Sequence, residues 1–377
     1  MSKVLVVGCG VSGRAVIDFC LNREDEVVCV DRHIDNKVPC SIFPEDYFFA
    51  HFDFDLVVIS PGVRLNHPQV KRAYESGVEV IGEVELALKQ ISNQCVGITG
   101  TNGKSTVVSL IAHVLNSAGK KAHAVGNIGF PIISMVSKIM PEDILVVELS
   151  SFQLMTMHKK SLDIGVILNI TPDHLDWHGS FEAYKRAKLR IKELLKEGGV
   201  FLYPIENFDC ATKVCLHFGC SQEEIKKAFS TYNRLEHRME YVGEVNGVRC
   251  INNSKATNIG SLEHALNHTK GEIVLICGGV NKGVSMQPLA SMIEKKCRFV
   301  VLIGQSKEQI ASELTKNTPH AFAETMDEAV EKGLQQAARG DTLMLAPGCA
   351  SLDMFDNYKM RGKVFKQSVA KGHRDES

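Results

Sequence analysis

Short apolar runs and longer amphipathic stretches alternate along the chain. Four of the runs lie at residues 4–7, 56–59, 144–147 and 164–168. Nearly every position in them is apolar, which is typical of parallel strands that are buried on both faces. Between the runs, apolar residues recur every three or four positions, as in residues 107–115, and this spacing predicts amphipathic helices. The pattern therefore predicts an α/β fold built on parallel sheets.

A glycine-rich turn at residues 97–106 joins one such strand to one such helix. Backbone N–H groups of the turn and the helix N-terminus would point at one place, where a polyphosphate can sit. Lys104 would reach the outer phosphates, and the hydroxyl of Ser105 or Thr106 would reach Mg²⁺. The general G-x-x-x-x-G-K-[ST] pattern lacks its first glycine here, because Ile98 stands there and Gly97 lies one residue early. The flanking strand and helix favour a phosphate site over a plain turn.

A second glycine turn, with Gly8, Gly10 and Gly13, follows the first strand. The next strand ends at Asp31, which completes the arrangement typical of a dinucleotide-binding βαβ unit. Taken alone, this motif indicates an NAD-linked dehydrogenase. It is a weak signal, however, because any anionic ligand can use such a helix N-terminus.

The alternation of strands and helices repeats three times, which predicts three domains at residues 1–89, 90–263 and 264–377. The first and last should be Rossmann-like, and the central one should be a P-loop-type ATPase domain with a parallel sheet. Within the central domain, Ser180 is a good N-cap for a helix that we expect to run to the glycines at positions 198 and 199.

Polar residues follow the apolar strands of the central segment. Glu148 comes after one strand, and Asn169, Asp173 and His174 come after the next. Because the carboxyl ends of parallel strands meet at one edge of a sheet, these residues could line one site with Lys104. Glu148 would suit Mg²⁺, which takes one or two carboxylates beside phosphate oxygens. The alternatives are an exposed loop carboxylate for Glu148 and a packed or capping histidine for His174.

Composition narrows the class of protein. The formal net charge of −1 over 377 residues gives no basic surface for nucleic acid or an anionic membrane. The chain begins directly in a strand, and no apolar run is long enough to span a bilayer. The twelve cysteines are scattered without zinc spacing, which favours free thiols in a reducing compartment. We expect a cytoplasmic protein that acts on small molecules, as a monomer.

Four motifs, in this order, resemble the Mur ligases: residues 99–106, 148–153, 169–176 and 184–188. Residues 254–258 and 349–353 are similar to the branch of this family that adds D-glutamate. The resemblance extends to about Phe365 and implies domains for UDP, ATP and the amino acid. The activity it implies is an ATP-dependent amide ligation in peptidoglycan precursor synthesis. D-glutamate would be joined to UDP-N-acetylmuramoyl-L-alanine, with release of ADP and phosphate.

The resemblance also implies which residues form the site. The catalytic residues would be Lys104, His174 and Lys188. ATP would be bound by Gly100, Thr101, Asn102, Gly103, Lys104, Ser105, Thr106, Lys255 and Asn258. Two Mg²⁺ ions would be held by Ser105, Glu148, His174 and Lys188. The UDP substrate would contact Val11, Ser12, Asp31, Arg32, Ser60 and Asn127. D-glutamate would contact Lys282, Ser351, Leu352 and Tyr358.

The implied mechanism explains why the site needs cations and metal ligands. ATP would phosphorylate the alanyl carboxylate, and the amine of D-glutamate would then displace phosphate from the acyl phosphate. Two anions must meet in the first step, so Lys104 and Mg²⁺ would neutralise them. The implied carbamate, formed on Lys188 with CO₂, would turn a repelling cation into a metal ligand. Composition alone would place Lys188 on a solvated basic helix face, because residues 185–192 are rich in lysine and arginine.

The chain departs from the family pattern in a few places. It is shorter than usual between Gly199 and His237, and Asn253, Asn281 and Ser285 stand where the family carries aspartate. Three alternatives remain open. One is another ADP-forming amide ligase, similar to folylpolyglutamate synthetase. The second is an NAD-dependent oxidoreductase, and the third is a nucleotide-binding regulator that has lost catalysis.

Overall fold

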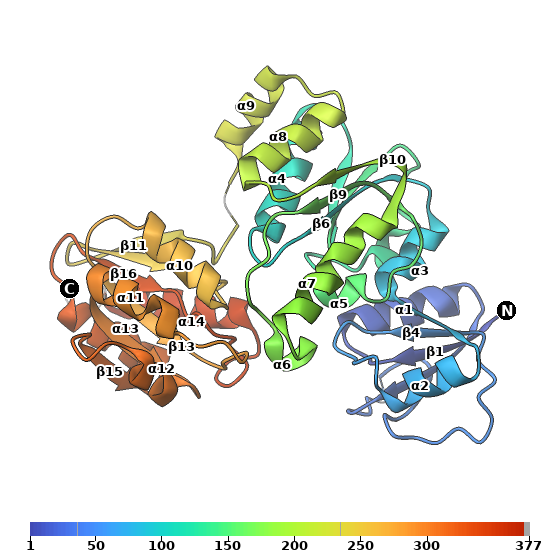
Figure 1. Cartoon of the computed structure of the whole chain (residues 1–377), viewed down its shortest axis with the longest axis horizontal. Coiled ribbons are helices and arrows are strands. Elements are labelled where there is room, and N and C mark those ends of the chain that lie inside the picture. The colour runs from blue at the N-terminus through green and yellow to red at the C-terminus, as the bar shows by residue number, and fades with distance from the viewer. Residues whose placement is uncertain (36, 234, 373–377) are drawn as a thin grey trace. The chain divides into compact units, whose positions relative to one another are not determined.

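The computed structural model describes residues 1–35, 37–233 and 235–372 (Figure 1). It contains three separate sheets with helices on their faces, which confirms the predicted α/β class and its three parallel-sheet domains. The described chain forms two compact units. One comprises Met1–Ile170 with Lys185–Tyr232, and the other comprises Thr171–Tyr184 with the described residues from Asn233 onward. The boundaries at residues 89 and 263 stay a prediction; the third sheet as observed begins at Glu240.

The first sheet is parallel and has the order β3-β2-β1-β4-β5, in which the first strand lies at the centre. Val4 and Val6 of β1 pack with helix α1, whereas Leu5 and Val7 pack on the other face with α2. The two helices accordingly lie on opposite sides of β1 and β4 (Figure 1). The elements are β1 Lys3–Val7, α1 Val11–Asn22, β2 Glu26–Asp31, β3 Ser41–Pro44, β4 Leu56–Ile59, α2 Pro68–Glu75, β5 Glu79–Gly82 and α3 Glu83–Gln90.

The second sheet is also parallel, with the order β10-β9-β6-β8-β7. Val96 and Ile98 of β6 pack against the buried face of α4, and α8 and α9 cover α4 in turn. Cys95 faces the opposite side, where the core is shared with α1 and α3. The elements are β6 Gln94–Thr99, α4 Lys104–Ser117, β7 Ala122–Gly126, η1 Ile132–Met135, β8 Ile144–Glu148, α5 Ser151–Leu154, β9 Leu162–Ile167, α6 Leu175–His178, α7 Phe181–Leu189, η2 Arg190–Leu194, β10 Leu195–Leu202, α8 Asn207–His217 and α9 Gln222–Thr231.

The helix expected from Ser180 to the glycines at 198 and 199 is shorter than predicted. Ser180 does cap it, since its hydroxyl oxygen accepts a hydrogen bond from the N–H of Ala183 at 3.2 Å. The helix α7 ends at Leu189, however, and the edge strand β10 starts at Leu195. The two glycines lie inside this strand, where the register against β9 shifts between Leu195 and Val200. Glycine in a strand interior often marks such an irregularity, so here it was not a helix stop.

The third sheet has the order β11-β12-β16-β13-β14-β15 and is parallel except for the β11–β12 hairpin. One face packs against α10, α11 and α12, and the other against α13 and α14. Strand β16 lies between β12 and β13, so distant segments meet at the middle of the sheet. The elements are β11 Glu240–Val245, β12 Val248–Asn252, α10 Ile259–His268, β13 Ile273–Gly278, η3 Gln287–Leu289, α11 Ala290–Lys296, β14 Cys297–Ile303, α12 Lys307–Glu313, β15 His320–Ala323, α13 Met326–Gln336, β16 Thr342–Leu345 and α14 Tyr358–Gly372.

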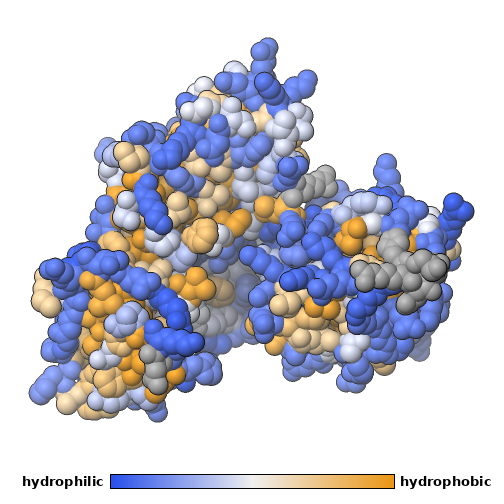
Figure 2. Space-filling model, turned by 180° about the vertical axis from the view of Figure 1, so that it is seen from behind, coloured by the Kyte–Doolittle hydropathy of each residue, from blue (hydrophilic) through white to orange (hydrophobic). Residues whose placement is uncertain are grey.

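The surface is largely polar. On the face in Figure 2, hydrophilic side chains cover most of the area, and hydrophobic ones form smaller areas between them. Among the described residues, no helix has the length and apolar character that crossing a membrane requires. The cysteines are free thiols and, apart from the half-buried Cys40, are buried, as the sequence predicted.

Candidate active site

The glycine-rich turn between β6 and α4 is held in a defined shape by its own lysine and by Asn169. The ammonium of Lys104 donates to the carbonyl oxygens of Gly100 at 2.8 Å and Thr101 at 2.9 Å. The side chain of Asn169, which follows β9, accepts from the N–H of Asn102 at 2.9 Å and donates to its carbonyl at 3.1 Å. Gly103 begins α4 with φ of 87°, a conformation that disfavours residues with a Cβ. The turn thus places a cation at a helix N-terminus, which is suited to bind phosphates.

A buried carboxylate lies at the end of the neighbouring strand β8. Glu148 is 2% exposed, and its Oε1 accepts a hydrogen bond from the amide of Asn127 at 2.8 Å. Its Oε2 is buried and has no hydrogen-bond partner among the described residues. A buried carboxylate oxygen without a partner is costly unless a cation binds it. Glu148 therefore fits the magnesium role predicted for it, with the hydroxyl of Ser105 at the start of α4 as a second oxygen.

Lys188 is the basic residue of α7 that reaches the phosphate loop. It is 1% exposed, and its ammonium donates to the carbonyl of Gly100 at 2.8 Å and lies 3.4 Å from the hydroxyl of Thr99. Arg186, two positions earlier, is exposed. The sequence contains a signal for the burial of Lys188 and the exposure of Arg186. The spacing of Tyr184, Lys188 and Ile191 places these three residues on the same, buried face.

The first glycine turn, between β1 and α1, is also tightly built. A Cβ at Gly13 would lie 1.9 Å from the carbonyl oxygen of Gly8, so no larger residue fits there. The hydroxyl of Ser60, at the end of β4, donates to the same carbonyl at 2.7 Å. The carboxylate of Asp31 accepts from the N–H groups of Cys9 and His33.

Three other residues predicted to bind UDP lie around this turn, whereas Asn127 lies beside Glu148. Val11, at the start of α1, is 74% exposed, and Ser12 follows it. Arg32 follows β2, and its guanidinium donates to Glu45 at 2.8 Å. An open helix N-terminus flanked by these groups can receive an anionic ligand.

In the other unit, a buried carboxylate joins two predicted site residues. Asp173 is 4% exposed; its Oδ1 lies 3.2 Å from the ammonium of Lys282, and its Oδ2 accepts from the amide of Asn258 at 2.8 Å. Burial opposes ionisation of Asp173, but Lys282, the neighbouring His174 and Asn258 outweigh it and lower the pKa of Asp173. His174 has a φ of 54° and begins the short helix α6. Asn258 caps α10 by accepting from the N–H of Ser261 at 2.8 Å.

The positions predicted for D-glutamate lie at the ends of the third sheet. The loop after β16 pairs with the loop after β13 through two hydrogen bonds between Ala350 and Val280, of 2.9 and 3.0 Å. Ser351 is buried, whereas Leu352 is 72% exposed. At the start of α14, the ring of Tyr358 has the ammonium of Lys255 4.0 Å from its centroid.

Comparison with known proteins agrees with this geometry. Three family models match the chain: "Mur ligase MurD-like, N-terminal domain" at residues 2–82, "Mur ligase middle domain" at 98–245, and "Mur ligase, glutamate ligase domain" at 237–349. UDP-N-acetylmuramoylalanine–D-glutamate ligases from Protochlamydia amoebophila and Caldicellulosiruptor bescii are each 34% identical to it, over 97% of this chain and 97% of theirs. The chain belongs to the Mur ligase family.

Solved structures of Mur ligases share its fold at much lower identity. UDP-N-acetylmuramate–alanine ligase MurC from Thermotoga maritima is 16% identical, with a TM-score of 0.60 over 98% of this chain and 100% of that one. MurF ligase from Thermotoga maritima, solved with ADP, is 13% identical, with a TM-score of 0.62 over 99% and 95% of the two chains.

Two of the departures of this Mur ligase from the family pattern have local structural roles. Asn253 accepts from the N–H of Met239 at 3.2 Å, and Asn281 accepts from the N–H of Val284 at 2.9 Å. The third, Ser285, donates to Glu313 at 3.0 Å. In these bonds the two asparagines act as acceptors, a role that aspartate also fills, so the structure gives no reason for an amide at these two positions.

The structure thus groups the predicted residues into two sets. In the first unit, Lys188 contacts the loop of residues 100–106 at Gly100, and Asn127 contacts Glu148, whose strand β8 pairs with β6. In the second unit, Lys282 and Asn258 share Asp173, and Lys255 contacts Tyr358. The sequence did not point to one residue of the second set, Arg361, because an arginine on an amphipathic helix is ordinarily a surface residue.

Proposed function

We propose that this Mur ligase joins D-glutamate to UDP-N-acetylmuramoyl-L-alanine with ATP, releasing ADP and phosphate. One observation carries the proposal. The phosphate loop has a buried lysine hydrogen-bonded to it, and a buried carboxylate with a partnerless oxygen lies at the end of the neighbouring strand. A nucleotide-binding regulator would need the loop alone. An oxidoreductase would leave all three unexplained.

The first step is the transfer of the γ-phosphoryl group to the alanyl carboxylate. The carboxylate oxygen attacks phosphorus, the bond to the β-phosphate oxygen breaks, and an acyl phosphate and ADP result. The Lys104 ammonium, now on the carbonyls of Gly100 and Thr101, stands where phosphates would offer stronger acceptors. Ser105 and Glu148 would hold Mg²⁺, which when bound neutralises charge on the phosphates.

Lys188 takes part as a carbamate in this proposal. A neutral amine adds to CO₂ and loses a proton, which gives an N-carboxylate with two oxygen ligands. The contact of Lys188 with Gly100 puts this group at the phosphate loop, close to where charge must be balanced. The burial of Lys188 supports the same role, because a dry environment disfavours the ammonium form. His174 would assist at the second Mg²⁺.

The second step forms the amide bond. The amine of D-glutamate attacks the acyl carbon, phosphate leaves with the electrons of the carbon–oxygen bond, and the nitrogen loses a proton. Lys282 would attract a carboxylate of this amino acid, and Ser351, Leu352 and Tyr358 would orient it. The UDP part of the other substrate would lie at the glycine turn of Gly8, Asp31 and Ser60.

Substrate dependence of ATP hydrolysis tests the proposal. ADP and phosphate should appear only when the purified chain receives both UDP-N-acetylmuramoyl-L-alanine and D-glutamate, and L-glutamate should not replace D-glutamate. A folate substrate with L-glutamate serves as the control for the related amide ligases. ATP turnover that ignores both proposed substrates, or that follows the folate pair, would refute the proposal.

A further inference from the structure

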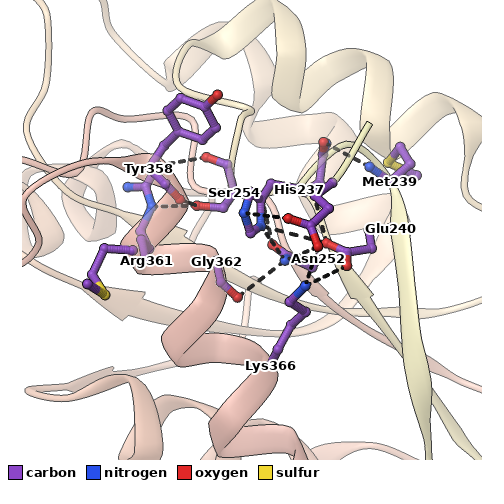
Figure 3. Close-up of polar contacts among 12 residues, drawn as sticks. His237, Met239, Glu240, Asn252, Ser254, Tyr358, Arg361, Gly362 and Lys366 are labelled. Atoms are coloured by element: carbon purple, nitrogen blue, oxygen red, sulfur yellow. Dashed lines mark hydrogen bonds and ion pairs between the residues drawn. The ribbon is translucent and has the colours of Figure 1, made fainter. Parts of the chain in front are cut away.

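Arg361 is an almost completely buried cation in the second unit. It lies on α14, is 1% exposed, and is the bulkiest of the fully buried side chains described. Its Nε donates to the hydroxyl of Ser254 at 3.1 Å, and its Nη2 donates to the carbonyls of Ser254 at 2.9 Å and Cys349 at 3.1 Å. Its Nη1 donates to the carbonyl of Ala350 at 3.2 Å. Figure 3 shows this side chain directed at Ser254, beside the backbone of Tyr358.

The hydrogen bonds of Arg361 all go to neutral acceptors, and the Asp353 carboxylate acts on its charge electrostatically. The four acceptors are neutral oxygens, and none of them is a carboxylate. Burial lowers the pKa of Arg361 to about 10, so the side chain stays charged at neutral pH. A buried charge of this kind is costly and weak support for stability by itself. Its planar fork can, however, fix several acceptors in one geometry, which a lysine cannot do.

The atoms that Arg361 holds belong to the segments that carry the proposed amino-acid site. Ser254 immediately precedes Lys255, and Ala350 immediately precedes Ser351. The Ala350 carbonyl is also bonded to Val280, two residues before Lys282. The Ser254 hydroxyl, in turn, donates to the carbonyl of Tyr358 at 2.8 Å. One guanidinium therefore fixes the backbone next to three residues that should contact D-glutamate, Lys282, Ser351 and Tyr358, and next to Lys255, which should contact ATP.

A second set of bonds supports the same turn from its other side (Figure 3). The side-chain oxygen of Asn252, which is fully buried, accepts from the N–H of Ser254 at 3.2 Å. The Asn252 amide donates to His237 Nδ1 and to Glu240, each at 2.9 Å. The carbonyl of His237 accepts from the N–H of Lys255 at 3.1 Å. With this turn anchored, Arg361 determines where the loop of residues 349–351 lies against it.

We propose that Arg361 is a positioning residue for the acidic amino acid: it fixes the loop of Ser351 against the turn of Ser254, which holds Tyr358, so that Ser351 and Tyr358 face the same dicarboxylate. The buried guanidinium also makes this region more favourable for an anionic ligand, through its field rather than by contact. The inference rests on the proposed function, because D-glutamate is the ligand that this subsite is proposed to bind.

Two variants of Arg361 test this role by steady-state kinetics. Arg361→Met keeps the bulk of the side chain but removes every donor, and Arg361→Lys keeps the charge but not the fork. Misplacement of a positioning group by about 1 Å can cost about 100-fold in rate, so kcat/KM for D-glutamate should fall by about that factor in Arg361→Met. Arg361→Lys should recover part of the loss. The KM for UDP-N-acetylmuramoyl-L-alanine should change less than about 2-fold in both, because the residues proposed to bind its UDP part lie in the first unit, whereas Arg361 and its acceptors lie in the second; a KM that changes for D-glutamate alone marks a local effect.

Arg298→Met is the matched control. Arg298 lies at the start of β14 in the same sheet and pairs with Asp341 at 2.6 Å. This variant should leave the D-glutamate kinetics unchanged. Ser254→Ala is a small change that removes one acceptor of Arg361. It should lower kcat/KM for D-glutamate less than Arg361→Met does, and it tests the same inference if the arginine variants fail to fold.

The outcomes separate the two proposals. If the unaltered chain does not respond to D-glutamate, the proposed function fails. If it responds, but Arg361→Met or Ser254→Ala lowers kcat while the KM for D-glutamate stays unchanged, or raises the KM of every substrate by the same factor, then Arg361 is merely structural and the inference is overturned.

Discussion

The phosphate loop and the amino-acid subsite are built in opposite ways. The loop is one continuous stretch, residues 97–106, and its shape follows from its glycines and from Lys104, which bonds carbonyls three and four residues earlier. The amino-acid subsite is assembled from four segments, at residues 254–258, 280–283, 349–352 and 358–361, and a buried arginine joins them. Both serve anions. One arises from local sequence, and the other arises only when the sheet has formed.

This difference in construction implies a difference in selectivity between the two regions. Backbone N–H groups at a helix N-terminus bind any polyphosphate, because they recognise charge and little else. Four segments held by directional bonds can instead fix the distance between two carboxylates. We therefore expect changes at the loop to affect the chemistry with every amino acid, and changes at the subsite to affect mainly the apparent affinity for D-glutamate.

The largest effect should come from Lys104→Met. Removing the cation that faces the phosphates should lower kcat by about 1,000-fold, since preorganised charge at a phosphoryl group contributes several kcal/mol. ADP release with saturating substrates measures this. Lys138→Met, at an exposed lysine of the same unit, is the control and should be as active as the unaltered chain. Retention of more than a tenth of the activity in Lys104→Met would show that the loop does not organise the transfer.

The second largest effect should come from Lys188→Ala, which should lower the rate of ligation by about 100-fold or more. ATP binding should persist, because Lys104 and the loop backbone remain, and calorimetric titration with ATP would show this. Arg186→Ala, on the exposed side of the same helix, provides the comparison. Carbon-13 NMR with labelled CO₂ should reveal a carbamate signal that is absent in Lys188→Ala. Normal ligation by that variant would remove the carbamate from the mechanism.

These two lysines also show which parts of the site could be predicted from the sequence. Lys104 lies in a local motif, so its placement against the loop was predictable from the glycines and the adjoining helix. Lys188 was identified only by resemblance, because a cluster of basic residues on a helix does not reveal which one is buried. Its burial depends on the packing of α7 over the second sheet, which the spacing of Tyr184 and Ile191 hints at but does not determine.

The strands at the sheet edges were the harder part of the fold. Buried strands such as β8 and β9 were predicted within one or two residues, since their runs at residues 144–147 and 164–168 are almost continuously apolar. The edge strand β10 contains two glycines and charged residues and is only partly buried, so its pattern could not be told from a helix end. Arg361 illustrates the same limit in the site, because its acceptors lie up to 107 residues away in sequence.

A smaller and more selective effect is expected at the amino-acid subsite. Lys282→Met should raise the KM for D-glutamate by about 10-fold, as expected for the loss of one charged hydrogen bond to a carboxylate. It should leave ATP binding unchanged. The control is Lys295→Met, an exposed lysine on α11. Equal weakening of ATP and D-glutamate binding would contradict the separation of the two regions.

Two buried titratable groups extend the comparison to stability. Burial raises the pKa of Glu83, in the first unit, to about 7, and its carboxyl accepts from the N–H of Ile133 at 2.8 Å. Burial lowers the pKa of His237, in the second unit, below its usual value near 6.5. Its Nδ1 faces the amide of Asn252, which requires that nitrogen to be an acceptor.

The two shifts have opposite signs in the pH dependence of unfolding. Between about pH 4.5 and 7, folded Glu83 holds a proton that the unfolded chain releases, so this group lowers stability as the pH rises through that window. Below about pH 6.5, the unfolded chain binds a proton that folded His237 does not, so this group lowers stability as the pH falls.

The smallest expected effect is on the pH dependence of stability. The melting temperature of each variant at these two groups should differ from that of the unaltered chain by about 2–4 °C, at one end of the pH range. Glu83→Gln, which cannot ionise, should lose less stability than the unaltered chain between pH 5 and pH 7.5. His237→Asn, which tolerates the φ of 63° at this position, should lose less between pH 7 and pH 5. Calorimetric scans across this range measure both slopes. If both variants keep the slope of the unaltered chain, these groups do not distinguish the two units, and the contrast would be confined to the binding sites.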